Sequence, residues 1–146
     1  MNDRPRPHVD VELACSCGAV TLSVKGTPRA MFMCACEDCQ KATGTGHSAV
    51  AVFDAADVTV AGQTHSFDRP ADSGATFTRT FCPACGTPIH GRSSRWAEAR
   101  ILPIGLFGRQ ADWFAPNQLI FSRSHHDWDM IADALPRHDT YRPKEA

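Results

Sequence analysis

The chain alternates short hydrophobic runs with turn-forming residues along most of its length. Runs of four to six residues, either β-branched or alternating apolar with polar, are bounded by glycine, proline or aspartate. Turns are predicted at residues 26–28, 61–62, 72–74 and 82–83. The runs predict strands at Val20–Lys25, Ser48–Phe53, Val58–Ala61, Thr76–Phe81, Ile89–Arg92, Ile101–Leu106 and Gln118–Ser122.

Only two stretches have a helical pattern. Glu37–Thr43 ends at Gly44, and Asp127–Leu135 stops before Pro136. The predicted fold class is therefore mainly β, with short antiparallel sheets and one or two short helices. Residues 1–8 are rich in proline and arginine and are expected to be flexible, residues 9–136 to form a single domain, and residues 137–146 to form a polar tail.

Composition narrows the class of protein. The 146 residues are 42% hydrophobic and 21% charged, as in an ordinary soluble domain, and the net charge of −1 offers no basic surface for nucleic acid or membranes. No run of 18 apolar residues is present, and the start of the chain lacks the apolar core of a signal peptide. We therefore expect a cytoplasmic protein with no nucleic-acid or membrane partner.

The seven cysteines fall into three tight groups with none elsewhere. Cytoplasmic thiols stay reduced, so clustered cysteines there indicate metal or redox chemistry more often than disulfides. An odd number would also leave one thiol unpaired in a disulfide framework.

Two of the groups look like matched halves of one metal site. Cys15-Ser-Cys17 is followed by Gly18, and Cys82-Pro-Ala-Cys85 by Gly86. A glycine after the second cysteine lets the backbone turn tightly and direct its N–H groups toward the thiolates. Four thiolates brought together in this way are typical of a closed, structural zinc site. The predicted ligands are Cys15, Cys17, Cys82 and Cys85.

The middle group has three cysteines within six residues and no fourth. Cys34, Cys36 and Cys39 can occupy one face of a single zinc, with the predicted helix starting beside them. Three protein ligands and one exchangeable position are the arrangement of a catalytic zinc. The sequence therefore predicts two zinc ions per chain.

Two other interpretations of the middle group remain open. Cys36-Glu-Asp-Cys39 has the Cys-x-x-Cys spacing of thioredoxin-like redox motifs, but those follow a strand in a βαβ unit that this sequence does not indicate. A histidine could instead supply a fourth ligand and close the site. His47 is the nearest in sequence; the others considered are His65, His90, His125 and His126.

The segments CSCGAV, CACEDCQKATG, RTFCPACGTPI, IGLF and WDMIADALP, in this order, resemble the glutathione-dependent formaldehyde-activating enzyme family, which includes the centromere protein V domain. The resemblance covers nearly the whole chain. It implies a tent-like β fold with a structural zinc on the four outer cysteines and a catalytic zinc on the three middle ones. It also implies carbon–sulfur lyase chemistry that joins glutathione to formaldehyde and gives S-hydroxymethylglutathione.

Glutathione carries two carboxylates, so a site for it should offer cations. Lys41 after the cysteine loop and Arg79 before Cys82 are the candidates. The family commonly has Arg-Lys where this chain has Gln40-Lys41, and Pro-Phe where it has Gly46-His47; His47 is therefore a third candidate for substrate binding. The alternatives to a lyase are a non-catalytic carrier of thiol adducts and a zinc-ribbon interaction module.

Overall fold

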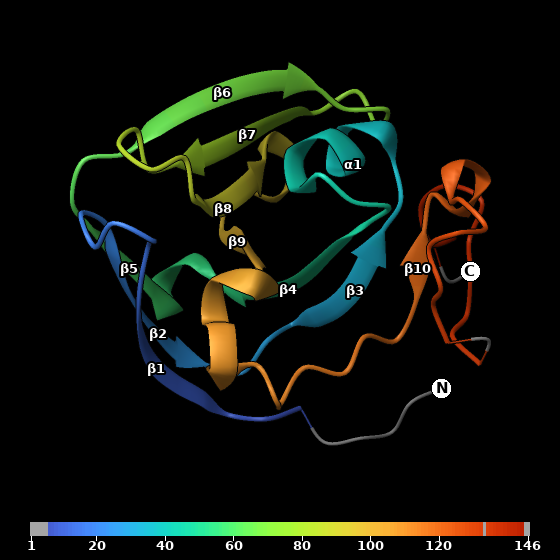
Figure 1. Cartoon of the computed structure of the whole chain (residues 1–146). Coiled ribbons are helices and arrows are strands. Elements are labelled where there is room, and N and C mark those ends of the chain that lie inside the picture. The colour runs from blue at the N-terminus through green and yellow to red at the C-terminus, as the bar shows by residue number, and fades with distance from the viewer. Residues whose placement is uncertain (1–5, 133, 145–146) are drawn as a thin grey trace. The chain divides into compact units, whose positions relative to one another are not determined.

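The computed structural model describes residues 6–132 and 134–144. The chain divides into two compact units, and Figure 1 labels the helices and strands of both. Within the described residues, unit 1 contains Met31–Val50 and the chain from Phe114 onward, and unit 2 contains residues 6–30 and Ala51–Trp113.

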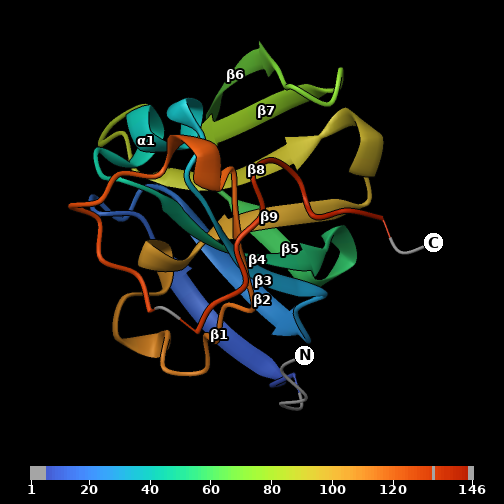
Figure 2. The same cartoon turned by 90° about the vertical axis from the view of Figure 1, so that its right-hand side faces the viewer.

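Unit 2 contains a three-stranded antiparallel sheet of β1 (Val9–Ala14), β2 (Thr21–Gly26) and β5 (Val58–Ala61), in the order β1-β2-β5 (Figure 2). Val9 and Leu13 on β1 and Leu22 and Val24 on β2 are buried, and the residues between them are exposed or half-buried. This alternation places one face of the sheet in the core.

The other strands of unit 2 continue a larger sheet in the order β4-β9-β8-β7-β6. Phe53 on β4, Ile89 on β8 and Leu102 on β9 are fully buried, whereas the edge strand β6 is almost wholly exposed. The bounds are β4 (Ser48–Asp54), β6 (His65–Pro70), β7 (Thr76–Phe81), β8 (Pro88–Ser93) and β9 (Ala99–Pro103), with 3₁₀ turns η1 (Ala55–Asp57), η2 (Ser94–Trp96) and η3 (Ile104–Gln110).

Unit 1 is built on β3 (Ala30–Cys34), which pairs in parallel with β10 (Leu119–Ile120). The cysteine loop leads from β3 into the helix α1 (Glu37–Thr43), and η4 (Ser122–Ser124) follows β10. Its apolar core consists of Met33, Ala35 and Leu119, against which Ala49, Ile131 and Leu135 pack.

The prediction of a mainly β fold is confirmed, with α1 at the predicted residues 37–43. Three strands were not predicted: β1, β3 and β6. β3 is an apolar run that does not alternate, and β6 is an exposed edge strand, so neither carries a clear period-2 signal. The predicted strand 101–106 is shifted, because β9 begins at Ala99 and the chain turns into η3 after Pro103.

The predicted helix at Asp127–Leu135 is wrong for the residues that the structure describes there, which form turns, bends and irregular chain. Hydrogen bonds run from the Asp129 N–H to His126 and from the Leu135 N–H to Ala132, over three residues rather than four. A helix this short is marginal by itself, so tertiary contacts decide its conformation. Here the side chain of Asp129 is held by two histidines, and Ile131 and Leu135 pack on the core of unit 1.

The C-terminal segment contributes hydrogen bonds to unit 1. The N–H of Leu119 donates to Pro136, that of His138 donates to Leu119, and that of Phe121 donates to Thr140. The predicted division into residues 1–8, 9–136 and 137–146 stays a prediction, and residues 1–5 lie outside the described residues. In the described chain, no helix has the length and apolar character needed to cross a bilayer.

Candidate metal centres and an adjoining pocket

Unit 2 brings the sulfur atoms of Cys15, Cys17, Cys82 and Cys85 together, although the two pairs are far apart in sequence. All four sulfurs lie within 4.8 Å of one another. The Sγ of Cys17 is 3.6 Å from that of Cys15 and 3.7 Å from that of Cys82. A tetrahedron of thiolates around zinc at about 2.3 Å has edges of about 3.8 Å, so this group fits the ion.

Hydrogen bonds favour the ionised form of two of these thiols. The N–H of Val20 donates to the Cys15 Sγ at 3.3 Å and lowers its pKa. The Thr87 hydroxyl lies 3.1 Å from the Cys85 Sγ and, with the Thr87 N–H, lowers the pKa of Cys85 to about 5. Metals bind the thiolate, so these hydrogen bonds prepare Cys15 and Cys85 for a cation. Gly18 and Gly86 both have positive φ, of 81° and 76°, as the tight turns after Cys17 and Cys85 require.

Unit 1 brings Cys34, Cys36 and Cys39 together, again with all three sulfurs within 4.8 Å. Cys34 ends β3, and Cys36 is the N-cap of α1, where its Sγ accepts a hydrogen bond from the Cys39 N–H at 3.4 Å. Gly44 ends the helix in the left-handed conformation that its sequence predicts. A strand end and one helical turn therefore hold the three thiols, and the group could hold one metal ion.

The thiols of this second group oppose one another's ionisation. The pKa of Cys34 is raised by hydrogen bonding with Cys36 and Cys39 and by burial. Three neighbouring thiolates are stable only with a cation among them. When zinc binds such a group, the thiols lose their protons and coordinate the metal as thiolates. No histidine or carboxylate belongs to the group within the residues that the structure describes, so it offers three protein ligands.

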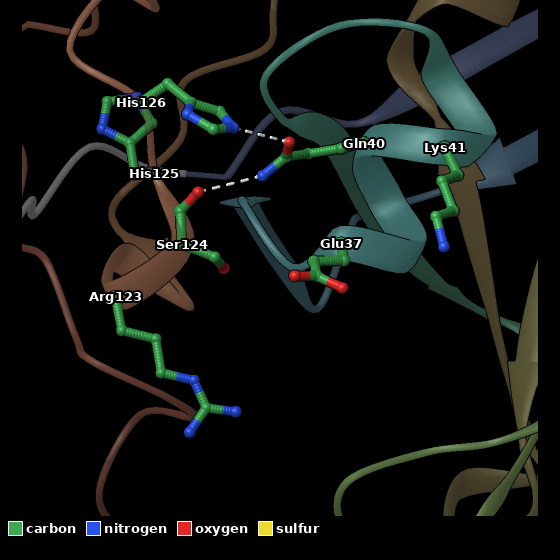
Figure 3. A pocket seen from close by; sticks show the side chains of 7 residues that line it. All are labelled: Glu37, Gln40, Lys41, Arg123, Ser124, His125 and His126. Carbon is green, nitrogen blue, oxygen red and sulfur yellow. Dashed lines mark hydrogen bonds between the residues drawn. The ribbon is translucent and has the colours of Figure 1, made fainter.

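A pocket of about 550 Å³ lies beside the cysteine loop, within unit 1 (Figure 3). One wall comes from α1 and the other from η4 and the residues that follow it. No cysteine lines the pocket. Its lining is polar and charged: Glu37, Gln40, Lys41, Arg123, Ser124, His125 and His126.

Gln40 makes three hydrogen bonds, and two of them join the two walls of the pocket. Its Nε2 donates to the carbonyl oxygens of Ala35 at 2.9 Å and Ser124 at 3.0 Å. Its Oε1 lies 3.1 Å from the Nε2 of His126, which must then be the donor. The His126 ring also stacks on Trp128, with 5.2 Å between ring centroids and an interplanar angle of 12°. Gln40, which directly follows Cys39, therefore holds the opposite wall of the pocket in place.

The three residues predicted to bind substrate lie in different places. Lys41 lines the pocket, and its role there stays a prediction. His47 does not line it; its Nδ1 lies 2.6 Å from Oδ2 of Asp129. Arg79 is in unit 2, on β7, half-buried and opposite Gly91 on β8.

Other polar groups of this unit were not predicted from the sequence. Asp129 Oδ2 is shared by His47 and His125, whose Nε2 is 3.1 Å away, and the Asp129 side chain is only 10% exposed. Glu37, Arg123 and Ser124 also line the pocket. Glu37 had a sequence signal, since it lies inside the cysteine loop, but η4 is more than 80 residues away and nothing in the sequence links the two.

Comparison with known proteins agrees with these features. The sequence model of the family described as "Glutathione-dependent formaldehyde-activating enzyme" matches residues 10–124, which include both cysteine groups. The crystal structure of a Rhodobacter sphaeroides protein is similar to this chain with a TM-score of 0.53 and 17% identity, over 67% of this chain and 88% of that one. At that identity, the likeness concerns the fold. The family match spans well over half of the sequence, and the chain belongs to the glutathione-dependent formaldehyde-activating enzyme family.

Proposed function

We propose that the protein is a zinc-dependent carbon–sulfur lyase that joins glutathione, or a similar thiol, to formaldehyde or a related small carbonyl compound. The observation that carries the proposal is the cluster of Cys34, Cys36 and Cys39, three thiols within 4.8 Å with no fourth protein ligand, in a chain of this family. The four-cysteine group offers four protein ligands, the full set for a tetrahedral zinc, and is proposed as the structural site.

Each group of residues has a distinct part in this proposal. Cys34, Cys36 and Cys39 would hold a zinc ion, which when bound keeps a neighbouring thiol ionised near neutral pH and polarises a carbonyl. The adjoining pocket supplies cations, Lys41 and Arg123, for the carboxylates of the thiol substrate. The chain thus binds the large, charged substrate by its polar end and leaves the small carbonyl compound to enter by diffusion.

The reaction needs no redox partner. The substrate sulfur forms a bond to the carbonyl carbon, the π electron pair of the carbonyl moves onto its oxygen, and the proton released by the thiol ends on that oxygen. Because this addition also occurs in water, the contribution of the protein is orientation and control of the ionisation of the thiol.

Substitution of Cys36 by serine tests the proposal. Serine is a preferred N-cap, so Cys36→Ser keeps the cap of α1 while removing one thiolate from the three-cysteine group. We expect the zinc content to fall from two ions per chain to one, the melting transition to remain cooperative, and the formation of S-hydroxymethylglutathione to fall to the spontaneous rate. Metal analysis, thermal melting and a formaldehyde-trapping assay measure these three quantities.

Two results would contradict the proposal. Undiminished turnover in Cys36→Ser with half the zinc would show that the three-cysteine group is not the reaction site. Saturable binding of glutathione by the parent protein without any acceleration over the spontaneous reaction would instead identify a carrier of thiol adducts.

A further inference from the structure

The backbone between the first two thiols of the three-cysteine group is held by two side chains. Ala35 separates Cys34 from Cys36 and is fully buried. Its carbonyl oxygen accepts two hydrogen bonds, from the Nε2 of Gln40 at 2.9 Å and from the hydroxyl of Ser124 at 2.8 Å. A carbonyl oxygen has two lone pairs, so these side chains use its full capacity.

The N–H group of Ala35 is also engaged. It donates to the carbonyl oxygen of Ile120, the last residue of β10, at 3.0 Å. The N–H belongs to the peptide group between Cys34 and Ala35, and the carbonyl belongs to the peptide group between Ala35 and Cys36. Both peptide groups that connect the two cysteines are therefore fixed, and neither can rotate without losing a hydrogen bond.

The two side chains that hold the carbonyl come from segments far apart in the sequence and also bond to each other. Gln40 lies on α1, directly after Cys39, and Ser124 lies on η4 (Figure 3). The Nε2 of Gln40 donates to the Ser124 carbonyl oxygen at 3.0 Å, which closes a ring of three hydrogen bonds with Ala35. The Ser124 hydroxyl is also 3.2 Å from the Phe121 carbonyl oxygen, so its shorter hydrogen bond is the one to Ala35.

Helix α1 has caps that do not depend on this ring. Its N-cap is Cys36, whose Sγ accepts a hydrogen bond from the Cys39 N–H at 3.4 Å. Its C-cap is Gly44, whose N–H donates to the backbone carbonyl of Gln40 at 2.9 Å. The side-chain amide of Gln40 therefore takes no part in capping the helix, and what it holds is the backbone of the cysteine loop.

We propose that Gln40 and Ser124 are positioning residues for the metal ion of the three-cysteine group. By fixing the Ala35 carbonyl, they hold the sulfur atoms of Cys34 and Cys36 close enough together to bind one ion. The inference rests on the proposed function, because the ion is the zinc of that proposal. Three thiolates repel one another until the ion is bound, so a loop that is already held in place needs less ordering when the ion binds.

The zinc affinities of the purified protein, measured by competition with a chelator, test the inference without requiring catalysis. Gln40→Met keeps the length and helix propensity of the side chain but removes its N–H donor, and Ser124→Ala removes the hydroxyl. We expect each variant to bind one zinc ion per chain about 10- to 100-fold more weakly, as loss of a contact that orients a metal ligand does, and the other with the parent affinity. Ser124→Thr, which keeps the hydroxyl, should retain both affinities.

Cobalt(II) in place of zinc identifies the weakened site, because the thiolate-to-metal absorption of a site increases with its number of cysteine ligands. The weakened site should be the one with the lower absorption per ion, since three thiols form the group beside Gln40 and four form the other. A purely structural role of the ring would change the melting temperature without selecting one of these two absorption signals.

Gln110→Met is the matched control. Gln110 also donates its side-chain amide to a backbone carbonyl, that of Glu12 at 3.4 Å, but it lies in unit 2. It should leave both zinc affinities unchanged. Equal loss of affinity at both cysteine groups in Gln40→Met and Ser124→Ala, or parent affinities with a lower melting temperature, would overturn the inference.

These outcomes are separate from those that test the lyase. A parent protein with two zinc ions and no acceleration of the addition of glutathione to formaldehyde refutes the lyase. Selective loss of one zinc affinity in Gln40→Met and Ser124→Ala would still support their positioning roles. A parent protein that turns over its substrates, with variants that bind zinc as tightly as the parent, would refute the positioning roles alone.

Discussion

At the scale of single residues, local hydrogen bonding and charge decide which side chains ionise. His90 on β8 is the clearest case outside the cysteine groups. Its Nδ1 is buried and has no hydrogen-bond partner among the described residues, and burial together with the positive charges of Arg100 and Arg92 lowers its pKa to about 4. His90 is therefore neutral in the folded protein at physiological pH.

This histidine makes the stability of the protein sensitive to acid. In the unfolded chain His90 titrates near 6.5, so between pH 6.5 and 4 the unfolded state binds a proton that the folded state does not. The free energy of unfolding should fall as the pH drops through this range, and should be unaffected by His90 above it. His90→Gln should lose less stability than the parent between pH 7 and pH 4.5 in urea unfolding. Identical pH profiles of stability for the parent and His90→Gln would contradict this prediction. Any loss of zinc in acid affects both proteins equally, so it does not change the difference between them.

At the scale of secondary-structure elements, close packing across strands explains why glycine occupies a position that takes no part in metal or substrate binding. Gly91 on β8 lies opposite Arg79 on β7, and a side chain at this position would overlap the ring of Phe77. The guanidinium of Arg69 lies 4.7 Å from the centroid of that ring. The glycine therefore leaves space for an aromatic ring to lie over the strand.

Gly91→Ala should lower the free energy of unfolding by about 1–3 kcal/mol, because the Phe77 ring must move away from its contact with Arg69. Thermal and urea unfolding measure the change. Gly105→Ala is the matched control, since a Cβ there meets no atom within 4 Å and the backbone φ is not in the left-handed region. Equal stability of Gly91→Ala and Gly105→Ala would show that the ring is not confined.

At the scale of the whole molecule, the two cysteine groups lie in different units and differ in how far apart in the sequence their members are. The three-cysteine group is local, within six residues of unit 1. The four-cysteine group joins residues 15–17 to residues 82–85 inside unit 2, and so fixes contacts between distant parts of the chain. Loss of a metal at the first should affect function, and loss at the second should affect folding.

Cys85→Ser tests this difference. Zinc in a closed site contributes on the order of 10 kcal/mol to folding, which is comparable to the whole stability of a domain. We expect Cys85→Ser to give insoluble protein or a chain without a cooperative melting transition, whereas Cys36→Ser melts cooperatively. Circular dichroism during heating distinguishes the two variants. A cooperative melt of Cys85→Ser close to that of the parent would refute the assignment of the structural role to the four-cysteine group.

Sequence reasoning reached some features of the fold and missed others for physical reasons. α1 was predictable because its signals are local: a helix-forming run after Cys36 and a stop at Gly44. The edge strand β6 was not, because an exposed strand shows no hydrophobic alternation. The segment after Asp127 was wrongly predicted to be a helix. Its apolar residues have helical spacing, but Ile131 and Leu135 pack against Met33 and Leu119 from a chain that is not helical.

The sequence by itself determined how the seven cysteines divide into four and three, since spacing and the following glycines are properties of the chain, and it determined the family. Only the tertiary structure brought η4 to α1, and with it the pocket in which the side-chain amide of Gln40 bonds to Ser124 and His126. The reason is distance along the chain: a metal-binding loop is specified by neighbours a few residues apart, whereas a pocket wall formed by residues more than 80 positions away depends on how the strands pair.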